Sequence, residues 1–337
     1  MHKTIAIVGA SGVVGEKIFN LLKVRGFDQD TIELYAGTTK GRFLVYQGED
    51  YPILPVSDAD FSQIDIAFFT AGTEPSVEYA QKAADAGCLV IDNTNVFRMR
   101  DDVPLIVPQV NIKHLNGIPE SNIIANPNCS TIPLVRAMDT LDQRFGLKEA
   151  IVSTYQAVSG AGKAGIEELI DGAKAHLAGK EFTPTTFEAG IAFDVIPRID
   201  DDLTNGSTVE ELKMRQESRK ILDRPNIKVL ATCVRVPVIN CHSEAVVLRF
   251  EEKVDLDEVI KVLKNTEECV VHTGVGAASY PQPSEVSGSH NLHIGRIRID
   301  DEDSHTLLFW LVSDNLLIGA ALNAVQIAEK MRARGWI

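Results

Sequence analysis

A glycine-rich segment near the start of the chain places the strongest constraint on its fold. Ile5 to Val8 predicts a short buried strand, and Ile18, Leu21 and Leu22 recur at helical spacing. Between the two stands Gly9-Ala10-Ser11-Gly12-Val13-Val14-Gly15. Such a turn lets backbone amides approach a pyrophosphate at the N-terminus of the helix. Its position between a strand and a helix favours a dinucleotide-binding site over a simple tight turn.

Strand-like and helix-like segments alternate over roughly the first 130 residues, which is typical of a parallel sheet with helices on its faces. The strands predicted there are 5–8, 32–36, 64–69, 89–91 and 123–125. The second half has longer strands at 150–158, 229–239 and 245–250, with helices near 163–178 and 208–222. We therefore predict an α/β protein with a Rossmann-type dinucleotide-binding domain and a second domain of α+β type.

A final apolar helix at 316–332 is suited to pack back onto the first domain. The predicted domains are 1–128, completed by the C-terminal segment 315–337, and 129–314. A chain of 337 residues with 45% hydrophobic content is large enough for two such cores.

Charge and composition exclude several classes of function. The net charge is -14 and the basic residues form no stripe, which argues against binding a nucleic acid. No apolar run is long enough to span a membrane, and the first strand leaves no room for a signal sequence, so we expect a cytoplasmic protein. The five cysteines are odd in number and lack CxxC spacing, which predicts reduced thiols and no metal site.

Cys129 is the candidate nucleophile. It lies in Asn126-Pro127-Asn128-Cys129-Ser130-Thr131, where a buried strand ends and apolar residues at helical spacing begin. The free amides and the positive dipole end of a helix N-terminus stabilise a thiolate. A cysteine is more often a small buried hydrophobe, but this setting favours a nucleophile.

The choice of cofactor depends on the residues after the second strand, Gly37-Thr38-Thr39-Lys40-Gly41-Arg42. Hydroxyls and cations suit the 2'-phosphate of NADP, whereas an acidic residue at this tip would bind the ribose of NAD. Glu33 is the competing acid, and we interpret it as a strand residue too early to reach the ribose. The pattern favours NADP.

A series of motifs in order along nearly the whole chain resembles the aspartate-semialdehyde dehydrogenase family. The motifs are the glycine turn 9–15, Asp92-Asn93-Thr94 with Phe97-Arg98, Val107 to Asn111, Asn126 to Thr131, Tyr155 to Gly162, Arg235 to Val238, His242-Ser243-Glu244, Gly295 to Arg298 and Ser313 to Leu316. The resemblance implies a homodimer that interconverts L-aspartyl 4-phosphate and L-aspartate 4-semialdehyde with NADPH and phosphate. This reaction belongs to the biosynthesis of lysine, threonine and methionine. The second domain would then carry catalysis and dimerisation.

The resemblance also implies a role for each matching residue. Cys129 would form a thioester, His242 would act as acid and base while titrating near neutrality, and Gln156 would orient the acyl group. Arg235 would bind the substrate carboxylate and Glu210 its ammonium, with Arg98 and Lys213 on the phosphate and Asn93 and Asn128 nearby. The implied cofactor residues are Gly9, Ser11, Gly12, Val13, Thr38, Thr39, Thr70, Ala71, Gly72, Ser159, Gly160 and Asn315.

Local patterns and departures refine this interpretation. Thr208 and Glu211 predict a capping box, which places Glu210 and Lys213 one turn apart. The chain departs from the family at Thr38, where an arginine before a serine is common.

Two alternative functions stay open from the sequence. An N-acetyl-glutamyl-phosphate reductase would use similar chemistry, but it has a different cysteine motif and no ammonium for Glu210 to bind. A catalytically silent binding protein would not need Cys129, Gln156, Arg235 and His242 together.

Overall fold

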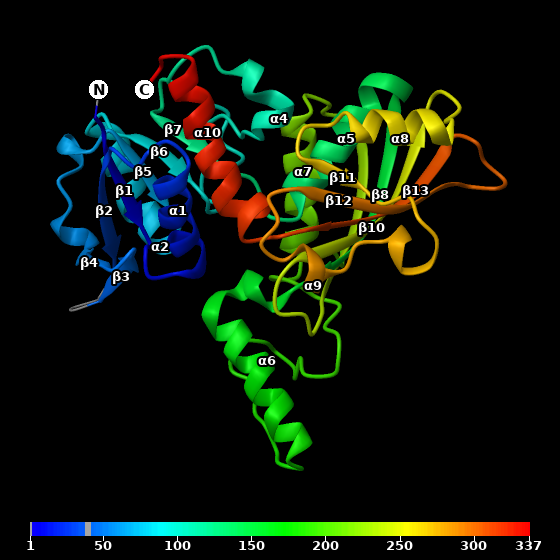
Figure 1. The fold of residues 1–337 in the computed structure, drawn as a ribbon, viewed down its shortest axis with the longest axis horizontal. Helices are drawn as coiled ribbons and strands as arrows, with labels where there is room; N and C mark the ends of the chain where they lie inside the picture. The colour runs from blue at the N-terminus through cyan, green and yellow to red at the C-terminus, as the bar shows by residue number, and fades with distance from the viewer. Residues whose placement is uncertain (1, 38–41) are drawn as a thin grey trace. The chain divides into compact units, whose positions relative to one another are not determined.

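The computed structural model describes residues 2–37 and 42–337. It divides into two compact units, shown in Figure 1. The first consists of the chain up to Asn128 together with Ala320–Ile337, and the second is Cys129–Gly319. Residues 315–319, predicted from the sequence to belong to the first domain, belong to the second unit.

A seven-stranded sheet forms the centre of the first unit, in the order β3-β4-β2-β1-β5-β6-β7. The strands are β1 Thr4–Val8, β2 Thr31–Ala36, β3 Phe43–Tyr46, β4 Glu49–Pro55, β5 Ile66–Phe69, β6 Leu89–Asp92 and β7 Ile123–Ala125. Only β3 runs antiparallel to its neighbour. β1 pairs with β2 on one side and with β5 on the other, so the direction of winding reverses between β1 and β5. Ligands of open α/β sheets bind at the carboxyl ends of the strands at such a reversal.

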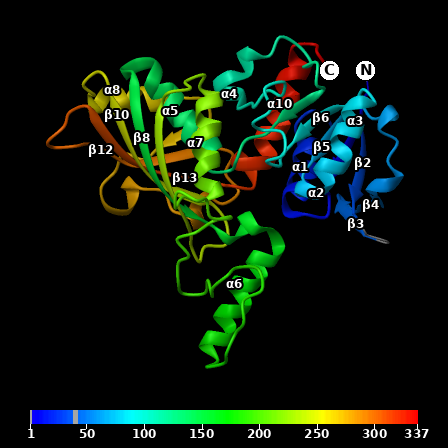
Figure 2. The ribbon, with the colours of Figure 1, turned by 180° about the vertical axis from the view of Figure 1, so that it is seen from behind.

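Helices lie on both faces of this sheet. Figure 1 shows the side of the sheet with α1 Val13–Val24 and α10 Leu322–Ala333. Figure 2 shows the opposite side, with α2 Thr73–Pro75 and α3 Gln81–Asp85. The unit also contains α4 Pro108–Asn111. The predicted C-terminal helix begins as a π-helical turn, Leu317–Ala321, before α10. α10 is tied to the first helix by Arg25, whose Nε donates to Glu329 at 2.7 Å.

The second unit is built on a six-stranded sheet in the order β11-β12-β13-β10-β8-β9. Its strands are β8 Leu147–Gln156, β9 Lys228–Arg235, β10 His242–Phe250, β11 Cys269–Val271, β12 Leu292–Ile299 and β13 Thr306–Ser313. The helices are α5 Thr131–Phe145, α6 Gly162–Leu177, α7 Val209–Ile221, α8 Leu256–Lys264 and α9 Pro283–Val286. α5, α7 and α8 cover one face of the sheet, whereas α6 extends away from it (Figure 1).

The covered face of this sheet changes from apolar to polar along its strands. In β10, Val246, Leu248 and Phe250 lie in the main hydrophobic core, while Glu244 and His242 continue the same face. In β8, Ala150 and Val152 are followed on this face by Thr154 and Gln156, and β9 ends with Arg235. The polar end of a rigid, buried face therefore positions the functional groups.

Short 3-10 helices connect several elements: Val56–Asp58, Phe61–Gln63, Ile112–His114, Val158–Ala161 and Gly276–Ser279. Within the described ranges we find no helix with the length and hydrophobicity that a bilayer crossing requires.

Candidate active site

Cys129 and His242 lie together in the second unit. The Cys129 sulfur is 3.2 Å from His242 Nε2. Cys129 is half-buried and stands two residues before α5, whose N-cap is Ser130. The strand, turn and helix around this cysteine are those that the sequence predicted.

His242 is completely buried at the start of β10. The backbone N–H of Ala157 donates to its Nδ1 at 3.0 Å, so the neutral ring carries its proton on Nε2, toward the sulfur. Burial, followed by the nearby Arg235 cation, holds the pKa of His242 well below its usual value. The expectation that this imidazole titrates near neutrality is therefore wrong, because desolvation disfavours its charged form.

The other four cysteines are held as thiols by their surroundings. Burial raises the pKa of Cys88 and Cys241 to about 12, and that of Cys269 to about 11. Burial likewise raises the pKa of Cys233. These residues have the inert character of structural cysteines.

Gly319 packs against the candidate nucleophile, a contact that the sequence did not reveal. A Cβ added to Gly319 would lie 2.7 Å from Cys129 Cβ and 3.0 Å from Cys129 Cα. Real Cβ atoms do not approach other carbons so closely, so only glycine fits beside the cysteine. The contact joins positions 190 residues apart, and no local pattern around Gly319 could have indicated it.

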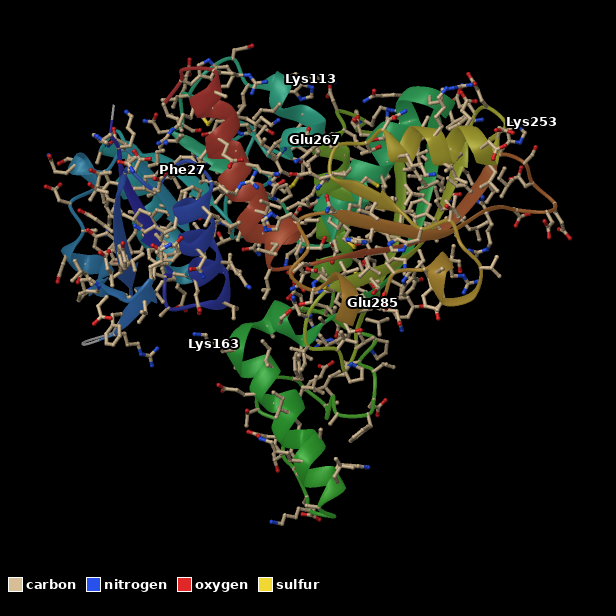
Figure 3. All side chains as sticks on the ribbon, in the orientation of Figure 1. Phe27, Lys113, Lys163, Lys253, Glu267 and Glu285 are labelled. Carbon is tan, nitrogen blue, oxygen red and sulfur yellow. The ribbon has the colours of Figure 1, made fainter. Side chains whose placement is uncertain are left out.

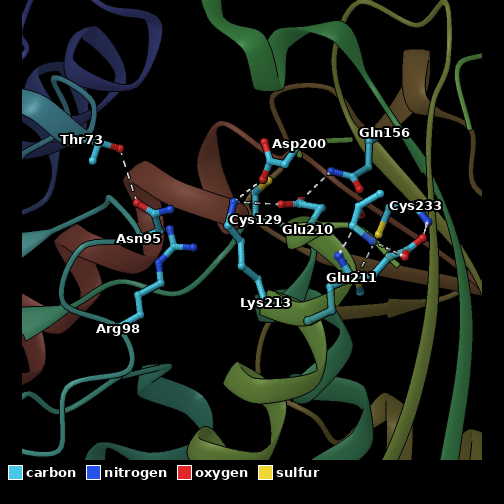
Figure 4. Close-up of polar contacts among 12 residues, drawn as sticks. Thr73, Asn95, Arg98, Cys129, Gln156, Asp200, Glu210, Glu211, Lys213 and Cys233 are labelled. Carbon is cyan, nitrogen blue, oxygen red and sulfur yellow. Dashed lines mark hydrogen bonds and ion pairs between the residues drawn. The ribbon is translucent and has the colours of Figure 1, made fainter. Parts of the chain in front are cut away.

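Figure 4 shows a chain of polar contacts from the sheet to α7. Gln156 accepts a hydrogen bond from Thr154 Oγ1 at 2.9 Å and donates to Glu210 Oε1 at 3.1 Å. Glu210 Oε2 is 3.3 Å from Lys213 Nζ, which also pairs with Asp200. Three predicted site residues, Gln156, Glu210 and Lys213, are thus brought together.

The predicted capping box at the start of α7 is confirmed. Thr208 accepts from the Glu211 amide, and the Glu211 side chain accepts from the Thr208 amide. This fixed helix start places Glu210 on the buried face, next to Gln156.

Arg235 lies at the end of β9 beside a cavity of about 350 Å³, which has the size of a small-molecule site. Its Nη1 donates to the Ala157 carbonyl at 2.8 Å. A Cβ on Gly160 would stand 2.9 Å from that nitrogen and 3.6 Å from His242 Cε1. Gly160, predicted to contact the cofactor, therefore also makes room for the arginine.

Ser159 and Asn315, both predicted to contact the cofactor, are buried and hydrogen-bonded to each other. Asn315 Nδ2 donates to Ser159 Oγ at 3.0 Å. The backbone N–H of Cys241 donates to Asn315 Oδ1 at 2.9 Å. This arrangement fixes the backbone next to His242.

The predicted cofactor turn of the first unit is built on a close approach of two backbone segments. Gly9 has a φ of +102°, and a Cβ there would lie 2.7 Å from the backbone of Thr70 and Ala71. Ser11 and Gly12 follow at the N-terminus of α1, which begins at Val13, and Gly72 ends the neighbouring turn. Both turns stand at the carboxyl ends of β1 and β5. Thr38 and Thr39 lie outside the described residues.

Arg98 is buried in the first unit and is held by backbone carbonyls. Its Nε donates to Asn126 at 2.9 Å and its Nη2 donates to Asn93 at 2.8 Å. Asn93 Nδ2 donates to the Phe69 carbonyl at 3.3 Å, and Asn128 is buried at the end of the unit. Arg98 and Asn93 therefore lie together at the carboxyl end of β6.

Comparison with known proteins gives a consistent result over the whole chain. Residues 4–118 match the family model of the semialdehyde dehydrogenase NAD binding domain, and residues 139–318 match that of the semialdehyde dehydrogenase dimerisation domain. An aspartate-semialdehyde dehydrogenase of Campylobacter jejuni is 43% identical over 331 residues, covering 97% of this chain and 96% of the relative. One of Aquifex aeolicus is 43% identical over 340 residues, covering 100% of both.

A solved structure leads to the same family. Aspartate semialdehyde dehydrogenase II from Vibrio cholerae, complexed with ASA, has a TM-score of 0.93 at 38% identity and covers 100% of both chains. The two domain models and these full-length relatives together mean that the chain belongs to the aspartate-semialdehyde dehydrogenase family.

Proposed function

We propose that this oxidoreductase converts L-aspartyl 4-phosphate to L-aspartate 4-semialdehyde and phosphate with NADPH, and catalyses the reverse reaction. The observation that carries the proposal is the contact of 3.2 Å between the Cys129 sulfur and His242 Nε2 at the start of α5, in a chain of this family. The names of the full-length relatives favour neither an N-acetyl-glutamyl-phosphate reductase nor a silent binding protein.

Cys129 is the nucleophile in this proposal. Its thiolate attacks the acyl carbon, the bond from that carbon to the phosphate oxygen breaks, and phosphate leaves with the electron pair. After hydride addition to the thioester, the thiohemiacetal oxyanion collapses, breaking the carbon–sulfur bond and releasing the aldehyde and the thiolate. Sulfur suits both steps because it is a strong nucleophile and its thioester is a good electrophile.

His242 donates a hydrogen bond to the negatively charged atom at each stage. Its Nε2–H stabilises the thiolate before attack and the thiohemiacetal oxyanion after hydride addition. The Ala157 amide keeps that proton on Nε2, because it occupies Nδ1. We expect asparagine at position 242 to lower kcat by roughly 100- to 10,000-fold with a smaller effect on substrate affinity. A change in KM alone would make His242 a binding residue.

The nicotinamide cofactor is proposed to lie in the cradle of Gly9, Ser11, Gly12, Val13 and Thr70 to Gly72. The close approach of Gly9 to Thr70 and Ala71 supports this placement, because a side chain would fill the turn. When bound, the cofactor supplies the hydride. NADP is preferred over NAD in this proposal on the basis of the hydroxyls of Thr38 and Thr39, which suit a 2'-phosphate.

The remaining polar residues are proposed to bind the substrate and phosphate. Arg235 would hold the α-carboxylate, which suits a guanidinium at a cavity. Glu210 would hold the α-ammonium and Gln156 would orient the acyl group. Arg98 and Lys213 would bind phosphate, with Asn93 and Asn128 close to it. Ser159, Gly160 and Asn315 would complete the nicotinamide side.

A homodimer is proposed to form through the second unit. The face of the six-stranded sheet opposite α5, α7 and α8 carries apolar side chains that are half-buried or exposed: Ile151, Tyr155, Leu230, Ala245, Val247 and Leu308. The match to a dimerisation domain over 139–318 supports this choice of unit. The five cysteines lie outside any disulfide, which fits the reducing cytoplasm in which we propose that the protein acts.

Phosphate-dependent reduction of NADP with aspartate semialdehyde tests the proposed function. Wild-type protein should turn over efficiently and should use NADP better than NAD. Cys129→Ala should abolish turnover and retain NADP binding, because no thioester can form. Turnover that persists in this variant would exclude the covalent mechanism. Efficient turnover of N-acetyl-glutamate semialdehyde instead would favour the alternative enzyme.

The identity of the nucleophile has a direct test. Wild-type protein mixed with semialdehyde and NADP, without phosphate, should accumulate the acyl group on Cys129, and peptide mass spectrometry should locate it there. Labelling of Cys88, Cys233, Cys241 or Cys269 instead would identify a different thiol. The raised pKa values of those four predict that they stay unlabelled.

A further inference from the structure

We propose that Glu168 is a positioning residue for substrate binding. Its carboxylate fixes the segment 185–187 and, through the ring of Phe187, orients the Arg235 guanidinium, which lines a cavity of about 350 Å³. The proposal rests on the proposed function, in which Arg235 binds the substrate α-carboxylate. Nothing in the sequence motifs singles out Glu168.

Glu168 gathers three consecutive backbone amides. It lies in α6, one and a half turns after Lys163, which is labelled in Figure 3. Its Oε2 accepts from the amides of Thr185 at 2.7 Å and Thr186 at 2.5 Å, and from Thr185 Oγ1 at 3.2 Å. Its Oε1 accepts from the Phe187 amide at 3.2 Å. Both oxygens therefore hold the same short segment.

The segment needs such an acceptor because it has no regular structure. Residues 180–195 form neither helix nor strand, so their amides lack the partners that a ladder would supply. Glu168 is buried, which raises its pKa, but the hydrogen bonds from Thr185, Thr186 and Phe187 outweigh burial and the pKa is lowered overall. An ionised carboxylate makes charge-assisted bonds to these amides, which are stronger than neutral ones.

Arg235 is contacted by Phe187 of the fixed segment and by Ile196 further along the chain. The Phe187 ring centroid is 5.8 Å from Arg235 Cζ. Further along, Ile196 and Arg235 exchange two backbone hydrogen bonds of 2.9 and 2.8 Å. Thr186, Phe187 and Arg235 all line the cavity of about 350 Å³. Bidentate recognition of a carboxylate requires the plane of the guanidinium to be held at one angle. The Phe187 ring and the Ala157 carbonyl together provide that constraint.

A positioning role and a purely structural role predict different kinetics. Loss of a structural contact lowers the fraction of folded enzyme and hence the maximal rate, without changing KM. Loss of guanidinium alignment weakens binding of the substrate carboxylate and raises KM for the semialdehyde. The effect should not extend to phosphate or NADP, because neither binds at Arg235 in the proposed function.

The test compares Glu168→Gln with Glu167→Gln, a neighbour on the same helix whose side chain is exposed. Glutamine keeps one acceptor oxygen, loses the charge and turns an NH2 group toward the amides. We expect KM for aspartate semialdehyde to rise roughly tenfold in Glu168→Gln, within the range for a lost charge-assisted bond. We expect kcat per active Cys129 thiol, and KM for phosphate and NADP, to stay within about twofold of wild type. Glu167→Gln should match wild type throughout.

A second variant separates the proposal from misfolding. Phe187→Leu leaves the Glu168 hydrogen bonds in place but removes the ring from Arg235, and it should reproduce the rise in KM for semialdehyde. The double variant should show no further rise, because both changes act through one contact. An unchanged KM in Phe187→Leu, or a loss of kcat alone in Glu168→Gln, would overturn the positioning role. Failure of the wild-type enzyme to turn over aspartate semialdehyde would instead count against the proposed function.

Discussion

The cysteine of the active site depends on the absence of a side chain at Gly319. Replacing Gly319 with alanine would place a Cβ 2.7 Å from Cys129 Cβ, so the backbone of one residue must move. We expect Gly319→Ala to destabilise the fold by about 1 to 3 kcal/mol, as overpacking does, and to slow alkylation of Cys129 and catalysis together. Thermal unfolding and iodoacetamide labelling measure these effects.

The matched control is Gly190→Ala. Gly190 has open space around the added Cβ and no positive φ, so this variant should behave as wild type. Equal activity and stability of Gly319→Ala and Gly190→Ala would mean that Cys129 tolerates a shifted neighbour.

Glu244 is a second residue at which burial decides the effect, here its contribution to the stability of the fold. It is completely buried, and neither carboxyl oxygen has a hydrogen-bond partner among the described residues. Burial raises the pKa of Glu244 well above its usual value. Between the unfolded pKa of about 4.3 and that raised value, the folded chain binds more protons than the unfolded chain. Its contribution to stability is therefore present at acidic pH and is lost as pH rises.

This loss of stability with rising pH can be tested with Glu244→Gln, whose side chain is neutral at every pH. The variant should gain thermal stability relative to wild type, and the gain should be larger near pH 8 than near pH 4.5. Circular dichroism melts at the two pH values measure the difference. A gain that is equal at both would show that Glu244 ionises no differently in the folded and unfolded chain.

Local signals predicted those elements whose ends depend on nearby residues. The capping box of Thr208 and Glu211 identified the start of α7, and the apolar spacing after Cys129 identified α5. The strands predicted to reach 158 and 239 end instead at Gln156 and Arg235. The Ala157 amide donates to His242 rather than to a neighbouring strand, and Pro237 has no amide to donate. The first contact joins residues far apart in sequence, and the second is a missing hydrogen-bond donor. Hydrophobic periodicity reports neither, so it did not reveal where these strands end.

The same distinction applies to the site. Cys129, Gln156, Arg235 and His242 were found because they lie in motifs. Glu168 acts through a segment that has no regular structure, and Gly319 acts through a residue far away in the sequence. Neither lies in a sequence motif that indicates its partner. The low pKa of His242 is a property of its burial, which the sequence did not reveal.

At the scale of an element, the prediction about phosphate binding concerns α7, because this helix presents both Glu210 and Lys213. Lys213 is ion-paired with Asp200 and Glu210, and only 19% of its side chain is exposed. Lys213→Ala should raise KM for phosphate by a factor that corresponds to about 1.5 to 3 kcal/mol, with little change in KM for NADP. Phosphate saturation in the oxidative direction measures this.

Lys174 provides the comparison for Lys213. It forms a surface pair with Asp171 at 2.9 Å, with 71% of its side chain exposed. Such pairs contribute about 0 to 1 kcal/mol, and Lys174→Ala should leave phosphate kinetics unchanged. Arg98→Ala should resemble Lys213→Ala if both cations bind phosphate. Phosphate curves that coincide for wild type, Lys213→Ala and Arg98→Ala would exclude both from the phosphate site.

For the whole molecule, the apolar face of the six-stranded sheet predicts the state of assembly. Val247 lies on the central strand β10, opposite Ile151 of β8 and Leu308 of β13, and all three are half-buried in the single chain. Contiguous apolar surface of this kind marks a protein interface, and the core of such an interface excludes charge. Val247→Asp would place a carboxylate in the middle of the face. Sedimentation velocity should therefore show a dimer for wild type and a monomer for Val247→Asp.

Leu177→Asp is the control, because Leu177 is 78% exposed at the end of α6 and lies on no strand of the sheet. Dissociation of both variants, or of neither, would show that the dimer does not form through this face.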